Sequence, residues 1–241
     1  MKISLLEGEK MGDFEYIRSN YISLKEEIAQ LGKDAGREIT LVAVTKSGSD
    51  EELIALAAAG VGDVGENRPG ELRRRGDLLR ERGYCPKLHE IGNLQRNKVK
   101  LIIESVDLIH SLDSISLAAE IDKQAKNAGK RVRALIEINS GREEQKGGIL
   151  PEDAEEFFLK VKEFSHIEIA GLMTMGPVCE DSEQLRPYFR ETKALFDRLN
   201  KDHGFSGGGI LSMGMSDSYR VAIEEGSTLV RVGRKLFIKE K

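Results

Sequence analysis

The chain shows one hydrophobic periodicity at its start and a second one that repeats through the rest. Between residues 13 and 31 apolar side chains recur every three or four positions, which predicts an amphipathic helix with one buried stripe. These positions are Phe14, Ile17, Tyr21, Leu24, Ile28 and Leu31. After this helix, short apolar and β-branched runs alternate with helical patterns. The predicted strands are 39–45, 63–65, 87–91, 108–111, 132–139, 167–173, 210–213 and 228–232. The predicted helices between them are 51–59, 69–82, 96–105, 115–128, 152–164, 182–200 and 217–225.

Strands that alternate with helices, without hairpins, indicate a parallel sheet. Eight such units in about 200 residues fit a closed barrel, because an open doubly wound sheet of this size usually has about five to seven strands. The sequence therefore predicts an α/β fold, a single (β/α)8 TIM-type barrel domain over residues 1–241. The barrel would span about 39–238 and an extra N-terminal helix about 10–32. We expect that helix to pack on the outside of the barrel or to cap its bottom.

Composition and charge narrow the classes of partner. The 241 residues are 39% hydrophobic, and 37 basic against 41 acidic side chains give a net charge of −4. Ten lysines and arginines gather between residues 68 and 100, but acids interleave with them. We interpret this stretch as a solvated helix face and expect no nucleic-acid partner. No apolar run approaches the roughly 18 residues that cross a bilayer, and the N-terminus lacks the apolar stretch of a secretory signal. We expect no membrane span and a cytoplasmic protein.

Several familiar motifs are absent or lie in the wrong context. Cys85 and Cys179 form no CxxC and the four histidines show no metal-ligand spacing, so we expect neither a disulfide framework nor a metal site. The segment Gly60-Val61-Gly62-Asp63-Val64-Gly65 has the letters of a dinucleotide-binding motif. That motif must follow a strand and open a helix, whereas this segment ends a predicted helix and leads into a strand. We interpret its glycines as a helix C-cap and a tight turn.

Lys46 ends the first predicted strand, and in such barrels the chemistry lies at the C-terminal ends of the strands. A lysine that leaves a strand buried on both faces is partly desolvated, which favours the neutral amine that attacks an aldehyde. The alternative is a lysine whose stem carries the ammonium out to solvent. From this segment alone, both interpretations stay open.

Small residues cluster at the predicted ends of the last two strands. Backbone N–H groups and the Ser212 hydroxyl would approach an anion there, and barrel phosphate sites commonly form after strands 7 and 8. Gly233 and Arg234 would close this cup, and Ser216 with Asp217 would cap the next helix. The alternative is a pair of ordinary turns. A lysine at strand 1 beside a phosphate cup at strands 7 and 8 describes a site for a phosphorylated aldehyde.

Several short motifs, taken in order, resemble one known family. They are Val42-Ala43-Val44-Thr45-Lys46, Gly65-Glu66-Asn67, 89–98, Lys146-Gly147-Gly148-Ile149, Gly171-Leu172-Met173, 211–216 and 226–233. They resemble the motifs of the YggS-like pyridoxal-phosphate homeostasis proteins, whose fold looks like the barrel domain of bacterial alanine racemases. The resemblance covers about residues 10–238. The resemblance implies that the protein binds pyridoxal 5′-phosphate (PLP) as a Schiff base on Lys46. It also implies a role in PLP homeostasis or delivery, without an established enzymatic activity.

The resemblance implies further site residues and shows some departures. The implied contacts are Asn67 beside the ring, Arg231 at the pyridine nitrogen, and Ser212, Gly214 and Gly233 at the phosphate. Arg234 stands where the family has a small hydroxyl residue, so it either adds a charged phosphate contact or points outward. Glu90 stands where an apolar residue is usual, and we interpret the preceding His89 as fixing loop structure.

Two classes of function stay open. A carrier would store PLP on Lys46 and release it to free amines or to apo PLP-dependent enzymes, and we expect it to be monomeric and to have no catalytic residues. A small PLP-dependent amino-acid racemase needs acid and base groups on both faces of its substrate, and related racemases complete that set from another domain and subunit. The sequence ends soon after Gly233, so we expect no such domain and favour the carrier. A Schiff-base aldolase without PLP is a third alternative.

Overall fold

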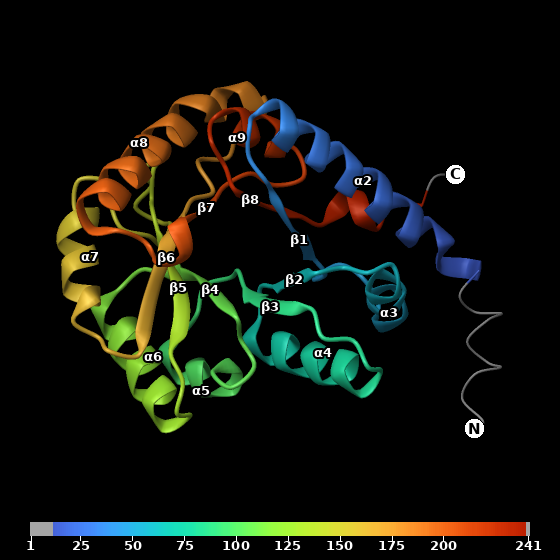
Figure 1. The fold of residues 1–241 in the computed structure, drawn as a ribbon, viewed down its shortest axis with the longest axis horizontal. Coiled ribbons are helices and arrows are strands. Elements are labelled where there is room, and N and C mark those ends of the chain that lie inside the picture. The colour runs from blue at the N-terminus through green and yellow to red at the C-terminus, as the bar shows by residue number, and fades with distance from the viewer. Residues whose placement is uncertain (1–11, 240–241) are drawn as a thin grey trace.

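The computed structural model describes residues 12–239, which form a closed barrel of eight parallel strands surrounded by helices (Figure 1). The strands are β1 (Thr40–Val44), β2 (Asp63–Glu66), β3 (Lys87–Glu90), β4 (Leu108–Leu112), β5 (Val132–Glu137), β6 (Ile167–Met173), β7 (Ile210–Ser212) and β8 (Leu229–Val232). Neighbours in sequence pair with one another, and β8 pairs with β1 to close the barrel. The predicted fold is confirmed, and each predicted run overlaps a strand, with β2 and β4 each one residue longer than predicted.

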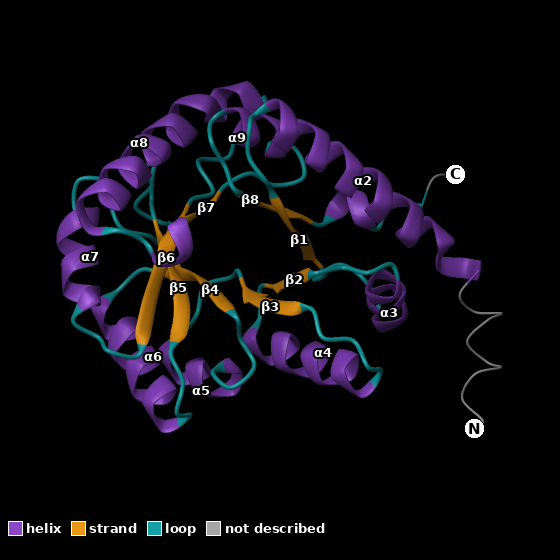
Figure 2. Ribbon diagram, viewed as in Figure 1, coloured by secondary structure: helices purple, strands orange, loops and turns teal. Residues whose placement is uncertain are grey.

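Each strand from β1 to β7 is followed by a helix of the outer ring (Figure 2). These helices are α3 (Asp50–Ala58), α4 (Pro69–Glu81), α5 (Val99–Ile102), α6 (Ile115–Asn127), α7 (Ala154–Lys162), α8 (Arg186–His203) and α9 (Tyr219–Glu224). Short 3-10 turns are η1 (Gly12–Phe14), η2 (Arg96–Lys98), η3 (Ser182–Leu185), η4 (Ser206–Gly208) and η5 (Arg234–Leu236). Among the described residues, no helix is both long and apolar enough to cross a bilayer.

Two local predictions at helix ends have different outcomes. Gly60 follows α3 with a φ of +85°, so the glycine-rich segment does end a helix and turn into β2, as predicted. The prediction that Ser216 caps the last helix is wrong, because α9 begins later and Ser218 is its N-cap. The chain first makes a turn in which Ser218 N donates to the carbonyl oxygen of Met215 at 2.9 Å.

The N-terminal helix α2 (Glu15–Asp34) packs on the outside of the barrel, against α3, α9 and η5 (Figure 1). Its buried residues are Ile17, Tyr21, Leu24, Ile28 and Gly32, which follow the predicted three-and-four spacing. Asn20 Nδ2 donates to the carbonyl oxygens of Leu236 and Ile238, at 3.2 and 2.8 Å. Of the two expected placements, the outside one is confirmed, and α2 fills the place in the ring that follows β8.

The barrel interior is filled in two layers, because side chains two positions apart on a strand share one face. The lower layer is an apolar cluster of Val42, Leu108, Leu135, Ala170, Met173 and Leu229, with Ile210 packed against it. Two positions farther along four of these strands stand buried or nearly buried polar residues. They are His110, Glu137, Ser212 and Arg231. The polar layer therefore lies toward the carboxyl ends of the strands.

Candidate functional site

The mouth of the barrel, the end at which the carboxyl ends of the strands meet, carries Lys46 on the turn after β1. Lys46 is exposed, and within residues 12–239 its ammonium has no hydrogen-bond or ion-pair partner. The expected desolvation by the barrel wall is therefore not seen, because Val44 is already the last residue of β1 and the chain has left the sheet. The structure instead offers an accessible amine at the mouth.

Glycines in the turns after β7 and β8 pack closely against neighbouring residues. Gly214 follows β7 with a φ of +90°, and a Cβ there would lie 2.6 Å from the Cβ of Ala222. A Cβ on Gly233, which follows β8, would lie 2.9 Å from the carbonyl oxygen of Val44. Because β8 pairs with β1, this approach sets the turn that carries Lys46 beside the end of β8.

Arg231 and Ser212 are buried together beneath these turns. One nitrogen of the Arg231 guanidinium donates to Ser212 Oγ, and the other donates to the carbonyl oxygen of Thr174 at 3.1 Å. Burial, opposed by the Glu137 carboxylate, lowers the pKa of Arg231 to about 10. The guanidinium therefore stays charged at neutral pH and places a buried cation below the mouth.

A chain of hydrogen bonds crosses the barrel interior from Arg231 to Asp63. Ser212 Oγ lies 3.1 Å from His110 Nδ1. His110 Nε2 lies 3.0 Å from His89 Nδ1, and His89 Nε2 lies 3.0 Å from Asp63 Oδ1. A guanidinium only donates and a carboxylate only accepts, so with both histidines neutral every bond points from the arginine toward the aspartate. Burial, with His89 and Arg231 nearby, lowers the pKa of His110 well below its ordinary value, which keeps that ring neutral.

This chain changes the interpretation of two residues. His89 does not fix a loop, because it lies inside the barrel on β3 and is only 3% exposed. Ser212 is fully buried, and its hydroxyl already has Arg231 and His110 as partners. The hydroxyl proton of Ser212 points toward His110, so its remaining contact with a ligand would be through oxygen.

Two buried glutamates near the mouth hold protons close to neutral pH. Burial foremost, and the Asp113 carboxylate as well, raise the pKa of Glu137 to about 7, while Arg231 opposes the shift. Burial and the Glu66 carboxylate raise the pKa of Glu90 to about 8. Since both groups are largely or partly protonated at neutral pH, the buried Arg231 keeps an excess of positive charge available to an anion.

Asn67 and Arg234 lie at the margins of the site. Asn67 is exposed and follows Glu66, whose carboxylate accepts a 2.5 Å hydrogen bond from Thr45 Oγ1, so the ends of β1 and β2 are joined. The Arg234 side chain is 70% exposed and pairs with the carboxylate of Asp217. Of the two orientations expected for Arg234, the structure shows the outward one.

Most of the predicted site residues lie close together, but not all of them do. Ser212 and Arg231 are in direct contact, Gly214 accepts from the Arg231 amide at 3.1 Å, and the turn of Lys46 is adjacent. Arg234 stands apart at the surface. Within the described part of the chain, no group of three or more histidine, cysteine or acidic side chains suits a metal ion.

These groups fit the chemistry of PLP. The accessible amine of Lys46 suits an aldehyde, and the charged Arg231 suits a ring nitrogen. Backbone N–H groups of the turns at Gly214 and Gly233 suit a phosphate, and that of Gly233 donates to Ser216 Oγ at 3.3 Å.

Three buried polar residues near the mouth lie outside the motifs named in the sequence analysis. They are Arg75, His110 and Glu137. His110 and Glu137 could be inferred only from their position, because each stands two residues after an inward-facing leucine and therefore faces the same side of its strand. Arg75 falls on the apolar stripe of its helix.

Known proteins similar to this chain share its fold along most of its length. Residues 20–240 match the family model described as alanine racemase, N-terminal domain. A pyridoxal phosphate homeostasis protein from Aquifex aeolicus is 40% identical over 201 residues, which are 83% of this chain and 87% of that protein. The solved structure of PipY from Synechococcus elongatus with PLP bound has a TM-score of 0.79 and 26% identity, and the match covers 92% of this chain and 100% of PipY.

A more distant likeness concerns the fold alone. An alanine racemase from Clostridium difficile has a TM-score of 0.70 at 18% identity, and the match covers 94% of this chain and 56% of the racemase.

Proposed function

This chain belongs to the pyridoxal phosphate homeostasis protein family, and from that premise we propose that it binds PLP and holds it in reserve for other proteins. The observation that carries the proposal is the accessible amine of Lys46 beside the turns at Gly214 and Gly233, above the buried guanidinium of Arg231. PipY, a structural neighbour, has been solved with PLP bound, which supports the choice of ligand.

Lys46 is the proposed point of attachment. When bound, PLP supplies an aldehyde that joins an amine as a Schiff base, and the Lys46 amine is the one we assign to it. Within residues 12–239 this amine has no partner, so the attachment breaks no ion pair. Asn67, across the joined ends of β1 and β2, would lie beside the ring. Backbone N–H groups at the turns of Gly214 and Gly233 would hold the phosphate.

Arg231 would limit side reactions of the stored PLP. A guanidinium has no acceptor, so Arg231 would donate to a pyridine nitrogen only while that nitrogen carries no proton. An unprotonated ring withdraws electrons weakly, and an amino acid that reached the site would lose its α-proton slowly. Slow loss of the α-proton would spare bound PLP from side reactions such as transamination, which suits storage.

The attachment is tested by trapping it. Apo-protein is mixed with PLP, reduced with borohydride and mapped by peptide mass spectrometry. We expect the label on Lys46 in the wild type and no label in a folded Lys46→Ala variant, with Lys98→Ala, another exposed lysine, as the matched control. A label on Lys98 or Lys146 alone would refute the assignment. If the wild-type protein develops no visible absorbance with PLP, the third alternative, a Schiff-base aldolase without PLP, would be favoured.

The storage role is tested by transfer. Loaded protein should activate an apo PLP-dependent enzyme, and it should exchange the α-proton of added amino acids with deuterium only slowly. Fast exchange would favour the racemase alternative. We propose a monomer, which sedimentation tests, and we propose that it acts in the cytoplasm.

A further inference from the structure

Three consecutive arginines in α4 differ in burial because of helical geometry. The side chains of Arg73 and Arg74 are 60% and 46% exposed, whereas that of Arg75 is only 9% exposed. Arg75 stands three residues after the buried Leu72 and four before the buried Leu79, so it shares the stripe that faces the strands. The expectation that this whole basic stretch is a solvated helix face is therefore wrong at Arg75.

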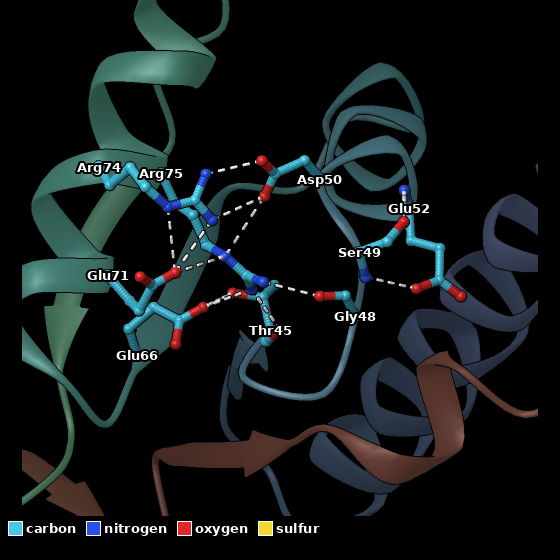
Figure 3. Close-up of polar contacts among 9 residues, drawn as sticks. All are labelled: Thr45, Gly48, Ser49, Asp50, Glu52, Glu66, Glu71, Arg74 and Arg75. Carbon is cyan, nitrogen blue, oxygen red and sulfur yellow. Dashed lines mark hydrogen bonds and ion pairs between the residues drawn. The ribbon is translucent and has the colours of Figure 1, made fainter.

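The Arg75 guanidinium contacts both ends of the turn that carries Lys46 (Figure 3). Nη1 donates to the carbonyl oxygen of Thr45, which precedes the lysine. Nη2 donates to the carbonyl oxygen of Gly48, two residues after it, at 2.7 Å. The amide of Gly48 also donates to the Thr45 carbonyl at 3.0 Å and closes the turn. One planar group thus fixes the backbone on each side of Lys46.

Glu66 holds the guanidinium in this orientation (Figure 3). Arg75 Nη1 donates to Glu66 Oε1 at 2.7 Å, and Thr45 Oγ1 donates to the same oxygen at 2.5 Å. The side chain of Glu66 is only 3% exposed, so water competes little for this ion pair. Because Glu66 ends β2, the ion pair joins the turn of Lys46 to the strand that leads into Asn67.

Arg74, the neighbouring arginine, does something different. It pairs with Asp50 at 2.6 Å and with Glu71 at 2.9 Å, both at the surface (Figure 3). Its hydrogen bonds go to the Asp50 and Glu71 carboxylates and not to the carbonyl oxygens of the Lys46 turn. Arg75 Nε also lies 3.6 Å from Glu71 and 3.8 Å from Asp50, so the two arginines share these acids. The difference between them is the backbone of the Lys46 turn, which Arg75 contacts.

We propose that Arg75 is a positioning residue that sets the place from which the Lys46 amine meets the aldehyde of PLP, without touching PLP itself. The inference rests on the proposed function of Lys46. The ring and phosphate contacts assigned above lie at β7 and β8 and do not involve Arg75. Loss of the clamp should therefore slow covalent capture by about 10- to 100-fold, the effect of a misplacement near 1 Å, and leave noncovalent binding unchanged.

The variants are chosen so that the protein folds. Removing Arg75 alone would leave the Glu66 carboxylate buried without a cation, so the first variant combines Arg75→Met with Glu66→Gln and removes both charges. The second is Arg75→Lys, which keeps a cation for Glu66 but cannot hold two carbonyl oxygens in the fork of a guanidinium. Arg74→Met is the matched control. Far-UV circular dichroism verifies the fold of each.

Two measurements separate positioning from a general structural role. Stopped-flow absorbance gives the capture rate at saturating PLP, and titration gives the affinity for pyridoxine 5′-phosphate, which has no aldehyde. We expect slower capture in both Arg75 variants at unchanged pyridoxine 5′-phosphate affinity, and wild-type behaviour in Arg74→Met. Wild-type capture rates in Arg75→Lys and in the double variant would overturn the inference. So would a parallel loss of capture and of pyridoxine 5′-phosphate affinity. A wild-type protein that carries no label on Lys46 would instead overturn the proposed function.

Discussion

Glu90 should make the protein less stable as the pH rises through neutrality, and Glu90→Gln should remove that loss. The glutamate ends β3 and has no exposed surface. Its Oε1 accepts from the amide of Gly92 at 3.3 Å, and its Oε2 has no hydrogen-bond partner within residues 12–239. Glutamine keeps the acceptor for Gly92 and has nearly the same shape, so the substitution changes charge and little else.

The size of the effect follows from the shift in pKa. Burial foremost, and then the Glu66 carboxylate, raise the pKa of Glu90 from 4.5 to about 8. The folded protein thus binds the proton more tightly than the unfolded chain, and stability falls as the pH rises from 4.5 to about 8. Each unit corresponds to about 1.4 kcal/mol. Between pH 6 and pH 9 this fall covers about two pH units, from pH 6 to the folded pKa of about 8. The free energy of unfolding of wild type should therefore drop by about 3 kcal/mol relative to that of Glu90→Gln.

Urea unfolding followed by far-UV circular dichroism at pH 6, 7.5 and 9 measures this difference. Glu137 titrates in the same window, but it is present in both proteins and cancels in the comparison. Glu163→Gln, at an exposed position just after α7, is the control and should follow wild type. Parallel pH profiles for wild type and Glu90→Gln would refute the reasoning, because the buried proton would then not be on Glu90.

Three further predictions concern the ligand and the fold. Pyridoxal should bind at least about 10-fold more weakly than PLP, since even one lost charge-assisted hydrogen bond is worth about 1.5–3 kcal/mol, and equal affinities by calorimetry would contradict the phosphate cup. Arg231→Gln adds an acceptor that tolerates a protonated ring nitrogen, so deuterium exchange of an amino-acid α-proton by loaded protein should rise; an unchanged rate would remove Arg231 from that nitrogen. Gly171→Ala places a Cβ 1.9 Å from the carbonyl oxygen of Ile210 at a φ of +146°, so urea unfolding should show a loss of stability of more than about 4 kcal/mol. Gly62→Ala is the control, because the space around Gly62 is open, and it should cause no such loss.

The strands could be predicted because each is buried on both faces. An apolar run such as Ile167–Met173 is then continuous, and its bounds in the structure are the predicted ones. Helix bounds were less predictable where a tighter turn precedes the helix, as at η2 before α5. Periodicity describes which face is buried, and it does not describe how a turn begins.

Contacts inside the site could not be predicted from local pattern. Ser212 and His110 are 102 residues apart in sequence and meet only because β4 and β7 line the same closed interior. Arg75 sits in a charged run that hides its place on the buried stripe of α4. The resemblance indicated Lys46 and Arg231, which lie within its motifs, whereas Arg75 and His110 lie outside them.

The row of hydrogen bonds from Arg231 to Asp63 has a polarity, and its two ends fix that polarity. A neutral imidazole has one donor and one acceptor, so no bond in the row can reverse alone. The Asp63 carboxylate only accepts, so a neutral His89 donates to it and accepts from His110, and His110 in turn accepts from Ser212. The Asp63 side chain is 18% exposed and starts β2 at the bottom of the barrel, so water there reaches the far end of the row. The aim of a hydroxyl below the mouth is thereby set by a carboxylate at the opposite end of the barrel.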